Sequence, residues 1–408
     1  MNGLQIARTA GHALLRNKLR SFLTAIGVVI GVSAVIAMVA IGEGAKRRVE
    51  QTFEAMGTNL LIVVPGSASS RGMMGGAGTK ATLTWADLAA IRKETAVRSV
   101  APVLRAGAVI QGEDQNWTTG VVGTSPDYVV IRSWNTTRGR TFDASDVDAA
   151  AKVVVLGQTV VEHLWGTNFD PVGHSVRVRG IPFKVIGVLE RKGQSPMGQD
   201  YDDTALVPSS TFETKVQAGL GGYVNGAIFV SAVAADQTGH AQSEIESLLR
   251  DRHRLVAGMD DDFSIRNLAE MAAAQQQGTA ILTTLLAAIA AVSLLVGGIG
   301  IMNIMLVSVT ERTREIGLRM AVGARSWDVL AQFLAEALAL SLGGGLIGIG
   351  VGVVAASRLA AYFGWPFSIH PEILAITVGF SALVGVVFGL YPARKASRLD
   401  PIDALRFE

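Results

Sequence analysis

The sequence predicts an α-helical membrane protein with four transmembrane helices and a large extracytoplasmic α+β domain on a helical stalk. Hydrophobic residues make up 49% of the 408 residues and charged residues only 17%. A soluble domain carries about 25% charged residues. Four long runs are almost free of charge, and about 20 apolar residues are enough to cross a bilayer core. Between the first and second runs lies a long stretch with the mixed composition of a soluble domain.

The N-terminal segment, residues 1–20, is basic and amphipathic, and we expect it to lie as a helix on the cytoplasmic membrane face. The first span follows at residues 21–42. A signal peptide is the alternative, but its apolar core is about 7–15 residues long and this run is longer. Gly27 and Gly31 are spaced as GxxxG and permit close helix packing. A specific dimer seam is left open there, because GxxxG also occurs by chance in glycine-rich spans.

Residues 43–277 are predicted to form the stalk and the extracytoplasmic domain. The stalk is an amphipathic helix that continues the first span and is closed by Gly57. Short apolar runs bounded by turn residues then predict an α+β domain. Strands are expected at 60–64, 97–103, 107–111, 117–122, 153–156, 175–178, 183–189, 223–230 and 262–265, and helices at 84–94, 159–165 and 237–253.

The C-terminal part holds the other three spans. The second span, residues 278–310, is longer than a bilayer core at roughly 1.5 Å per residue, so its helix is expected to begin in the stalk. The remaining segments are a charged island at 311–327, a third span at 328–357, a short external loop at 358–372, a fourth span at 373–391 and a tail at 392–408.

The distribution of basic residues sets the expected orientation. Residues 1–20, the island and the tail each hold four Lys or Arg residues, whereas the short loop at 358–372 holds Arg358 alone. Basic residues accumulate in cytoplasmic loops. Both termini and the island are therefore predicted to be cytoplasmic, and the large domain to be external.

The island is predicted to be a short surface helix. Glu315 and Arg319 stand at i,i+4, and Glu311 and Arg314 at i,i+3, spacings that stabilise a helix. Gly323 is expected to end this helix and Ser326 to cap the next one. From spacing alone, a docking helix and a plain solvated loop that fixes topology are equally compatible with the pattern.

One charge inside the third span has two interpretations. Glu336 lies near its inner edge, where an ionisable residue faces the protein interior or water. Snorkelling of the side chain to the membrane surface explains the residue equally well.

Three stretches resemble MacB-type ABC transporter permeases, which share the FtsX-like transmembrane fold. ERTREIGLRMAVGAR in the island resembles their cytoplasmic coupling helix, and YPARKASRLDPIDALRFE resembles their C-terminal signature. SFLTAIGVVIGVSAVIAMVAIGEG with NLLIVVPG resembles their first helix and first external strand. The resemblance implies a porter-like βαβ unit in the external domain, split by an inserted second subdomain at about 141–221.

The same resemblance implies a role for the island in coupling to an ATPase. The residues that match the coupling helix supply docking charges, apolar contacts and the helix end: Glu311, Arg312, Arg314, Glu315, Ile316, Gly317, Leu318, Arg319, Met320, Gly323 and Arg325. Ile316, Leu318 and Met320 are the residues expected to pack into a groove of the partner. In the tail, Arg394, Lys395 and Arg398 are expected to fix the topology and bind anionic lipid head groups, and an extension of the ATPase contact is the alternative.

The implied function is that of a non-catalytic permease subunit of an exporter for antibiotics, peptides or other small molecules. The implied partners are a separate ABC ATPase, a second copy or a paralogous permease, and, in a Gram-negative cell, a membrane-fusion adaptor with an outer-membrane duct. Two alternatives remain open: a lipoprotein-release permease, and FtsX-like signalling to a cell-wall hydrolase.

Several activities lack their sequence signatures. A Walker A loop reads GxxxxGK[ST], and GGAGTKAT at 75–82 does not have that spacing. ATP and magnesium are therefore expected on the partner ATPase, with no cofactor in this chain. Cysteine is absent, the six histidines lack ligand spacing, and no metal site is predicted. The sequence also lacks a basic stripe with interleaved aromatic residues, the pattern that indicates nucleic-acid binding.

Overall fold

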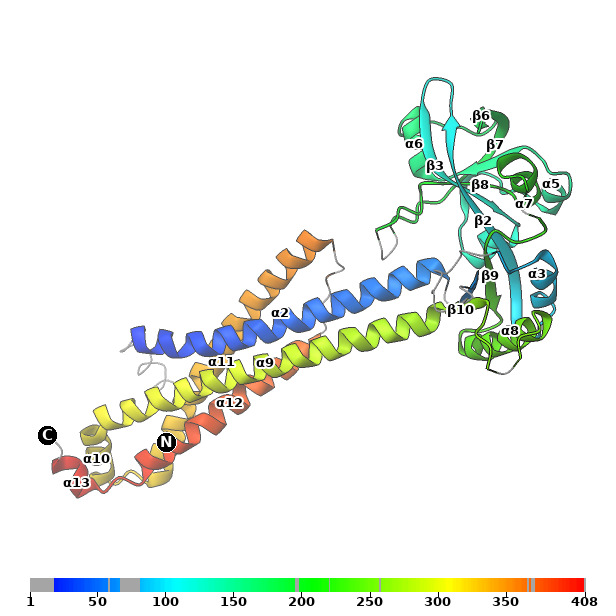
Figure 1. Ribbon diagram of the computed structural model, residues 1–408. Coiled ribbons are helices and arrows are strands. Elements are labelled where there is room, and N and C mark those ends of the chain that lie inside the picture. Colours follow the sequence, from blue (N-terminus) through cyan, green and yellow to red (C-terminus); the bar gives the residue numbers. More distant parts are fainter. Residues whose placement is uncertain are drawn as a thin grey trace. The chain divides into compact units, whose positions relative to one another are not determined.

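The protein divides into two compact units in a computed structural model (Figure 1). The model describes residues 18–57, 59–66, 81–194, 198–219, 221–256, 258–364, 367 and 371–406. Residues 1–48 and 276–408 form one unit, here called the helical unit, and residues 49–275 form the sheet unit. The N-terminal amphipathic helix expected over residues 1–20 falls outside the described residues as far as Asn17.

Four helices of the chain are long and apolar enough to cross a membrane: α2 (Lys18–Met56), α9 (Leu268–Glu311), α11 (Ser326–Phe363) and α12 (Pro371–Ser397). Helices α2 and α9 are unbroken and continue into the sequence of the sheet unit, as expected for helices that begin in a stalk. Two short helices, α10 (Thr313–Ala321) and α13 (Pro401–Arg406), complete the helical unit (Figure 1). Helix α12 passes the expected end of the fourth span and includes Pro392 within its length.

Close contacts at glycine hold the long helices together. A Cβ atom added to Gly27 would lie 3.0 Å from the Cα atom of Gly297 in α9, and one added to Gly31 would lie 3.0 Å from Cδ1 of Leu294. Small residues let helix backbones approach closely in a bilayer, where van der Waals packing drives association. Both glycines of the GxxxG pair therefore make close contacts with α9 of the same chain.

The sheet unit contains a ten-stranded mixed sheet with the order β10-β1-β9-β2-β3-β8-β5-β7-β4, and β6 pairs with β2 and β7. The strands are β1 (Leu60–Pro65), β2 (Val97–Gln111), β3 (Asn116–Thr124), β4 (Thr136–Gly139), β5 (Val153–Leu156), β6 (Ser175–Val178), β7 (Ile181–Leu189), β8 (Thr204–Pro208), β9 (Gly226–Ala232) and β10 (Phe263–Asn267).

Helices cover both faces of this sheet. Side chains of α3, α6 and α8 pack into one apolar cluster, while Tyr128 and Ile131 of α4 join a second cluster with Trp134. The helices are α3 (Trp85–Ile91), α4 (Asp127–Ile131), α5 (Ala144–Asp148), α6 (Gln158–Trp165), α7 (Ser209–Thr211), a π-helical turn (Phe212–Val216), a 3₁₀ turn (Ala235–Gln237) and α8 (Thr238–Arg252).

Strand pairing bears on two sequence-based expectations for the sheet. The strands expected at 97–103 and 107–111 are one strand, β2, because β9 pairs with its first half and β3 with its second. The subdomain expected at 141–221 is not a separate sheet, because β8 pairs in parallel with β3. Strand β4 lies before residue 141 and pairs with β7. A subdomain boundary at residue 141 would therefore divide the sheet.

A buried ionic cluster connects α3, the end of α8 and the segment before β10. Asp87 is 2% exposed and accepts hydrogen bonds from Arg252 Nε at 2.6 Å and from Thr84, the N-cap residue of α3. His253 Nδ1 lies 2.6 Å from Asp262 Oδ1, and its Nε2 lies 3.3 Å from Asp87 Oδ2. Burial opposes both charges, yet the hydrogen bonds outweigh it, so the pKa of Asp87 is lowered and the pKa of His253 is raised.

The glycine contact between α2 and α9 predicts a position-specific cost. Gly297→Ala would place a Cβ atom 2.9 Å from the backbone of Gly27, whereas Gly300 has no atom within 4 Å of the added Cβ. Overpacking of this kind costs about 1–3 kcal/mol. We expect Gly297→Ala to lower the melting temperature of the purified protein in detergent. Equal melting temperatures for Gly297→Ala and the control Gly300→Ala would contradict the contact.

The ionic cluster predicts a pH window for stability of the sheet unit. The contribution of His253 is complete below its unfolded pKa of about 6.5 and is lost as pH rises through the raised folded pKa. The contribution of Asp87 is complete above its unfolded pKa of about 3.9 and is lost as pH falls through the lowered folded pKa. Thermal unfolding, monitored by tryptophan fluorescence, should therefore show that the sheet unit is most stable between the unfolded pKa of Asp87, about 3.9, and that of His253, about 6.5. His253→Gln should flatten the alkaline decline, and the exposed His240→Gln should not.

Candidate functional site: the helix between the second and third spans

The island residues form a short helix that is fixed to the end of α9. Helix α9 ends at Glu311, Arg312 adopts a non-helical conformation, and α10 begins at Thr313. The hydroxyl of Thr313 donates to the carbonyl oxygens of Val309 at 3.0 Å and Thr310 at 2.9 Å. These bonds satisfy carbonyls that the end of α9 leaves without intrahelical partners. Glu311 and Arg314 therefore belong to different helices, contrary to the pair expected from their spacing.

One face of α10 packs on the short C-terminal helix α13. A Cβ atom added to Gly317 would lie 2.6 Å from the Cβ atom of Ala404, so only glycine fits at this contact. Ala404 and Ile316 are each 2% exposed, and Ile316 belongs to the same apolar cluster as Phe333 of α11. The apolar face of α10 is thus anchored to the helical unit of its own chain.

A chain of polar side chains, here called the polar ladder, ties α10 to α11. Arg319 forms an ion pair with Glu315 at 2.5 Å and donates to Gln332 Oε1 at 2.8 Å. Gln332 donates to Glu336 Oε1 at 3.3 Å, and Arg312 Nη1 lies 3.4 Å from both carboxylate oxygens of Glu336. Glu336 is 3% exposed. Its carboxylate faces the interior of the protein, so snorkelling does not account for this residue.

The opposite side of α10 and the turn after it are exposed. Arg314 and Glu315 lie on the surface, and Leu318, Val322 and Trp327 are 58%, 83% and 73% exposed. These three residues are here called the apolar tip. A Trp, a Leu and a Val side chain that are this exposed together offer an apolar contact for a partner.

Several island residues differ in exposure and contacts from what the sequence led us to expect. Of the three residues expected to enter a groove of a partner, Leu318 is exposed, Met320 is half-buried and Ile316 is buried in its own chain. Arg312 and Arg319 are engaged by Glu336 and by Gln332.

The end of α10 and the start of α11 are formed by residues near the expected ones. Gly323, with φ of +104°, lies just beyond the end of α10. Arg325, rather than Ser326, precedes α11, and its backbone N–H donates to Asp328 Oδ2 at 3.2 Å.

Sequence reasoning missed α13, Gln332 and Trp327. The start of α13 had a readable signal, since Asp400 followed by Pro401 is typical of a helix N-terminus, and Asp400 Oδ1 accepts from Ile402 N at 2.9 Å. Gln332 and Glu336 stand at i,i+4 and share a face of α11, a spacing that pointed to a polar pair.

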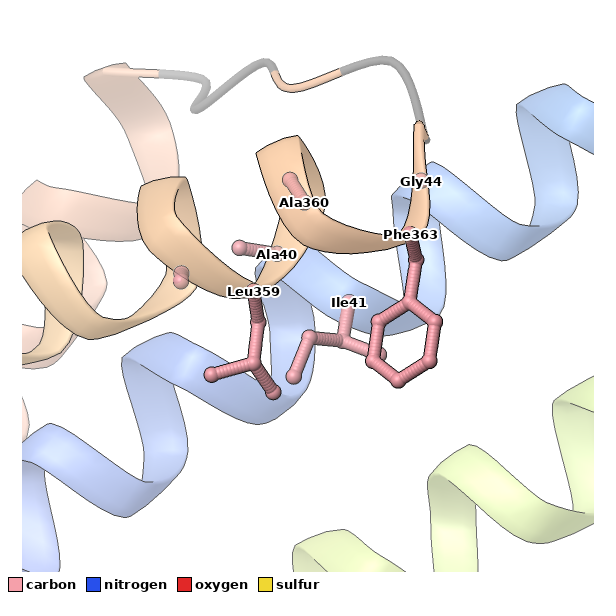
Figure 2. Close-up of a pocket in the computed structure, with 7 residues that line it drawn as sticks. Ala40, Ile41, Gly44, Leu359, Ala360 and Phe363 are labelled. Carbon is pink, nitrogen blue, oxygen red and sulfur yellow. The ribbon is translucent and has the colours of Figure 1, made fainter.

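A second feature of the helical unit is a small pocket between α2 and α11. It is lined by Ala40, Ile41, Gly44, Ala356, Leu359, Ala360 and Phe363, and its volume is about 90 Å³ (Figure 2). All the labelled side chains are apolar, so the pocket supplies packing surface and no acid, base or nucleophile. In the described part of the chain, no cluster of three or more His, Asp or Glu residues is placed to hold a metal ion.

The fold and this site define a class of protein before any comparison. Four apolar helices, a charged helix fixed between the second and third of them, and a mixed-sheet domain between the first and second define a multi-span membrane protein with a separate sheet domain. Residues 21–248 match the MacB-like periplasmic core domain, and residues 287–401 match the FtsX-like permease C-terminal domain. The chain therefore belongs to the MacB-type family of ABC transporter permeases.

Curated relatives agree with this assignment. The chain is 45% identical over 98% of its length to a macrolide export ATP-binding/permease protein MacB of Rhodospirillum rubrum, of which it covers 60%. It is 41% identical over 98% of its length to the protein of that name from Syntrophobacter fumaroxidans, of which it covers 63%. The chain thus spans about three fifths of the length of these relatives.

Two solved structures are similar to part of the chain. The periplasmic region of MacB from Actinobacillus actinomycetemcomitans matches with a TM-score of 0.46 and 21% identity, over 56% of this chain and 98% of that one. The extracellular domain of the noncanonic ABC-type transporter YknZ from Gram-positive bacteria matches with a TM-score of 0.41 and 19% identity, over 51% of this chain and 100% of that one.

The polar ladder predicts energetic coupling between Arg312 and Glu336. Removing one member of a buried pair leaves the other without its partner, so the single variants Arg312→Gln and Glu336→Gln and their combination should not be additive. We expect a coupling of about 0.5–3 kcal/mol in a double-mutant cycle of thermal unfolding.

A surface pair provides the matched control for this cycle. Arg92 and Asp127 are 2.9 Å apart, but their side chains are 54% and 40% exposed. Such pairs contribute about 0–1 kcal/mol. Additive effects at Arg312 and Glu336 would show that the ladder does not hold α10.

Proposed function

We propose that this chain is the permease subunit of an ABC exporter and transmits ATP-driven motion from a nucleotide-binding subunit to its extracytoplasmic domain. The single observation that carries the proposal is the construction of α10. One face is fixed to the chain's own spans through Gly317 and the polar ladder, while the apolar tip remains exposed. A helix built in this way moves together with the helices that hold it.

The cargo is proposed to be an antibiotic, peptide or other small molecule, because the curated relatives are named for macrolide export. ATP and magnesium belong on the nucleotide-binding subunit, since the 408 residues contain no Walker A motif. Two copies of the permease, or one copy and a paralogue, are proposed to assemble with it. An adaptor and an outer-membrane duct complete the proposal where the cell has an outer membrane.

The motion has a continuous route within the chain. Helix α9 begins at Leu268, directly after β10, and ends at Glu311, which adjoins α10. At about 1.5 Å per residue, a helix of this length exceeds the roughly 30 Å bilayer core by a wide margin. Tilt or translation of α10 would therefore be carried along α9 to the start of the sheet unit.

Substitutions in the apolar tip should weaken partner binding without unfolding the protein. We expect Leu318→Ala with Val322→Ala to reduce the affinity of the copurifying nucleotide-binding subunit at least tenfold, because central apolar contacts dominate interfaces. Val233→Ala is the matched control, since Val233 is 47% exposed in the sheet unit. Pull-down and ATPase stimulation in liposomes are the measurements. If the double variant kept wild-type affinity and wild-type ATPase stimulation, the island would serve only to set the topology of the chain.

The proposed orientation is testable with single cysteines, because the natural sequence has none. Asp114→Cys lies in the exposed turn between β2 and β3, and Lys395→Cys lies on the exposed side of α12 near its end. A membrane-impermeant thiol reagent should label the first in intact cells, with any outer membrane permeabilised, and the second only after lysis. The reverse pattern would overturn the orientation.

A further inference from the structure

A cavity in the sheet unit contains a buried arginine that no acidic residue neutralises. The cavity has a volume of about 470 Å³ and lies over β2, β3 and the end of α4, with residues 199–204 along one side. Arg132 lines it and is only 4% exposed. Its Nε atom is buried without a hydrogen-bond partner, and in the described part of the chain no carboxylate lies within 4.0 Å of its guanidinium nitrogens. An unpaired buried charge is costly.

Two acidic residues, Asp200 and Asp203, also line the cavity, and the hydrogen bonds that they accept come from residues other than Arg132. Asp200 accepts from the Thr159 hydroxyl at 2.6 Å and from the backbone N–H of Asp202 at 2.9 Å. Asp203 Oδ1 accepts from Trp117 Nε1 at 2.8 Å. Asp202 accepts from the backbone N–H groups of Lys192 and Gly193.

Two aromatic rings lie beside the arginine where it lines the cavity. The guanidinium carbon of Arg132 lies 4.7 Å from the ring centre of Tyr201 and 6.0 Å from that of Trp134. Lys192 Nζ lies 5.5 Å from the Trp134 ring. Burial, and to a smaller extent the charge of Arg132, lower the pKa of Lys192 to about 8, although Glu190 and Asp202 oppose the shift. Arg105 adds a second cation at the exposed rim.

From this cavity we infer that the sheet unit binds a small organic anion, in which a carboxylate pairs with Arg132 and a flat apolar body lies against the aromatic rings. A guanidinium presents two parallel N–H groups that match a carboxylate, and the resulting charge-assisted pair is strong and directional. The volume is that of a small-molecule site. This binding site is additional to the apolar tip and requires neither ATP nor a partner.

The test measures binding of 2-naphthoate to the full chain in lipid nanodiscs by equilibrium dialysis, with empty nanodiscs as the blank. The neutral analogue 2-naphthamide reports the contribution of the carboxylate, and acetate reports that of the flat body. We expect saturable binding of 2-naphthoate, and binding at least tenfold weaker for 2-naphthamide and for acetate.

Two variants remove the site in different ways. Arg132→Gln removes the charge, with the exposed Arg177→Gln on β6 as its control. Gly120→Leu fills the cavity from its wall, and an added Cβ there has no atom within 4 Å, so the strand can accept it. Its control is Gly239→Leu on α8, where an added Cβ also meets no atom within 4 Å.

Both test variants should weaken 2-naphthoate binding at least tenfold, and both controls should leave it unchanged. Gly120→Leu keeps the test valid if Arg132→Gln lowers the melting temperature. The inference is overturned if 2-naphthoate does not saturate, if 2-naphthamide binds as tightly, or if Gly120→Leu binds like the wild type.

Discussion

A carboxylate near the start of a long apolar helix is stable only when donors and a cation are held beside it. Glu336 meets this condition through Gln332 on its own helix and Arg312 at the junction of α9 and α10. The same requirement fixes α10, because Arg319 reaches the ladder at Gln332 and Arg312 reaches it at Glu336. A bilayer penalises an unpaired carboxylate, and the partners that Glu336 requires therefore determine where α10 is held.

Apolar close contacts also hold α10 in place, in addition to the polar ladder. Ala404 approaches Gly317 from α13, and Ile316 enters the cluster that also includes residues of α2, α9, α11 and α12. In the same unit, the pocket between α2 and α11 is lined by apolar residues. Charged side chains of the ladder hold α10 to α11, whereas hydroxyl groups link other spans, since Ser33 donates to the carbonyl of Gly348 and Ser381 to that of Ser341.

Local patterns predicted what depends on local physics. The uncharged runs predicted the four long helices, and the helix expected at 84–94 contains α3. Pairing across the sheet was less readable, since β2 is continuous only because β9 and β3 bind its two halves. The contact between Arg312 and Glu336 and the Arg132 cavity were beyond prediction for the same reason, because each brings together residues of different secondary-structure elements. Glu336 was recognisable as unusual, but its partner Arg312 was not.

The central claim is that α10 moves as one body with the spans that anchor it. The most direct measurement is the distance between spin labels at Arg314→Cys on α10 and Lys395→Cys on α12, two exposed positions in a protein without native cysteine. Pulsed electron paramagnetic resonance would record it in the reconstituted complex, without nucleotide and with ATP trapped on a hydrolysis-deficient partner. The account predicts the same narrow distance distribution in both states. A shift or broadening on ATP binding would contradict it, because α10 would then move independently of α12.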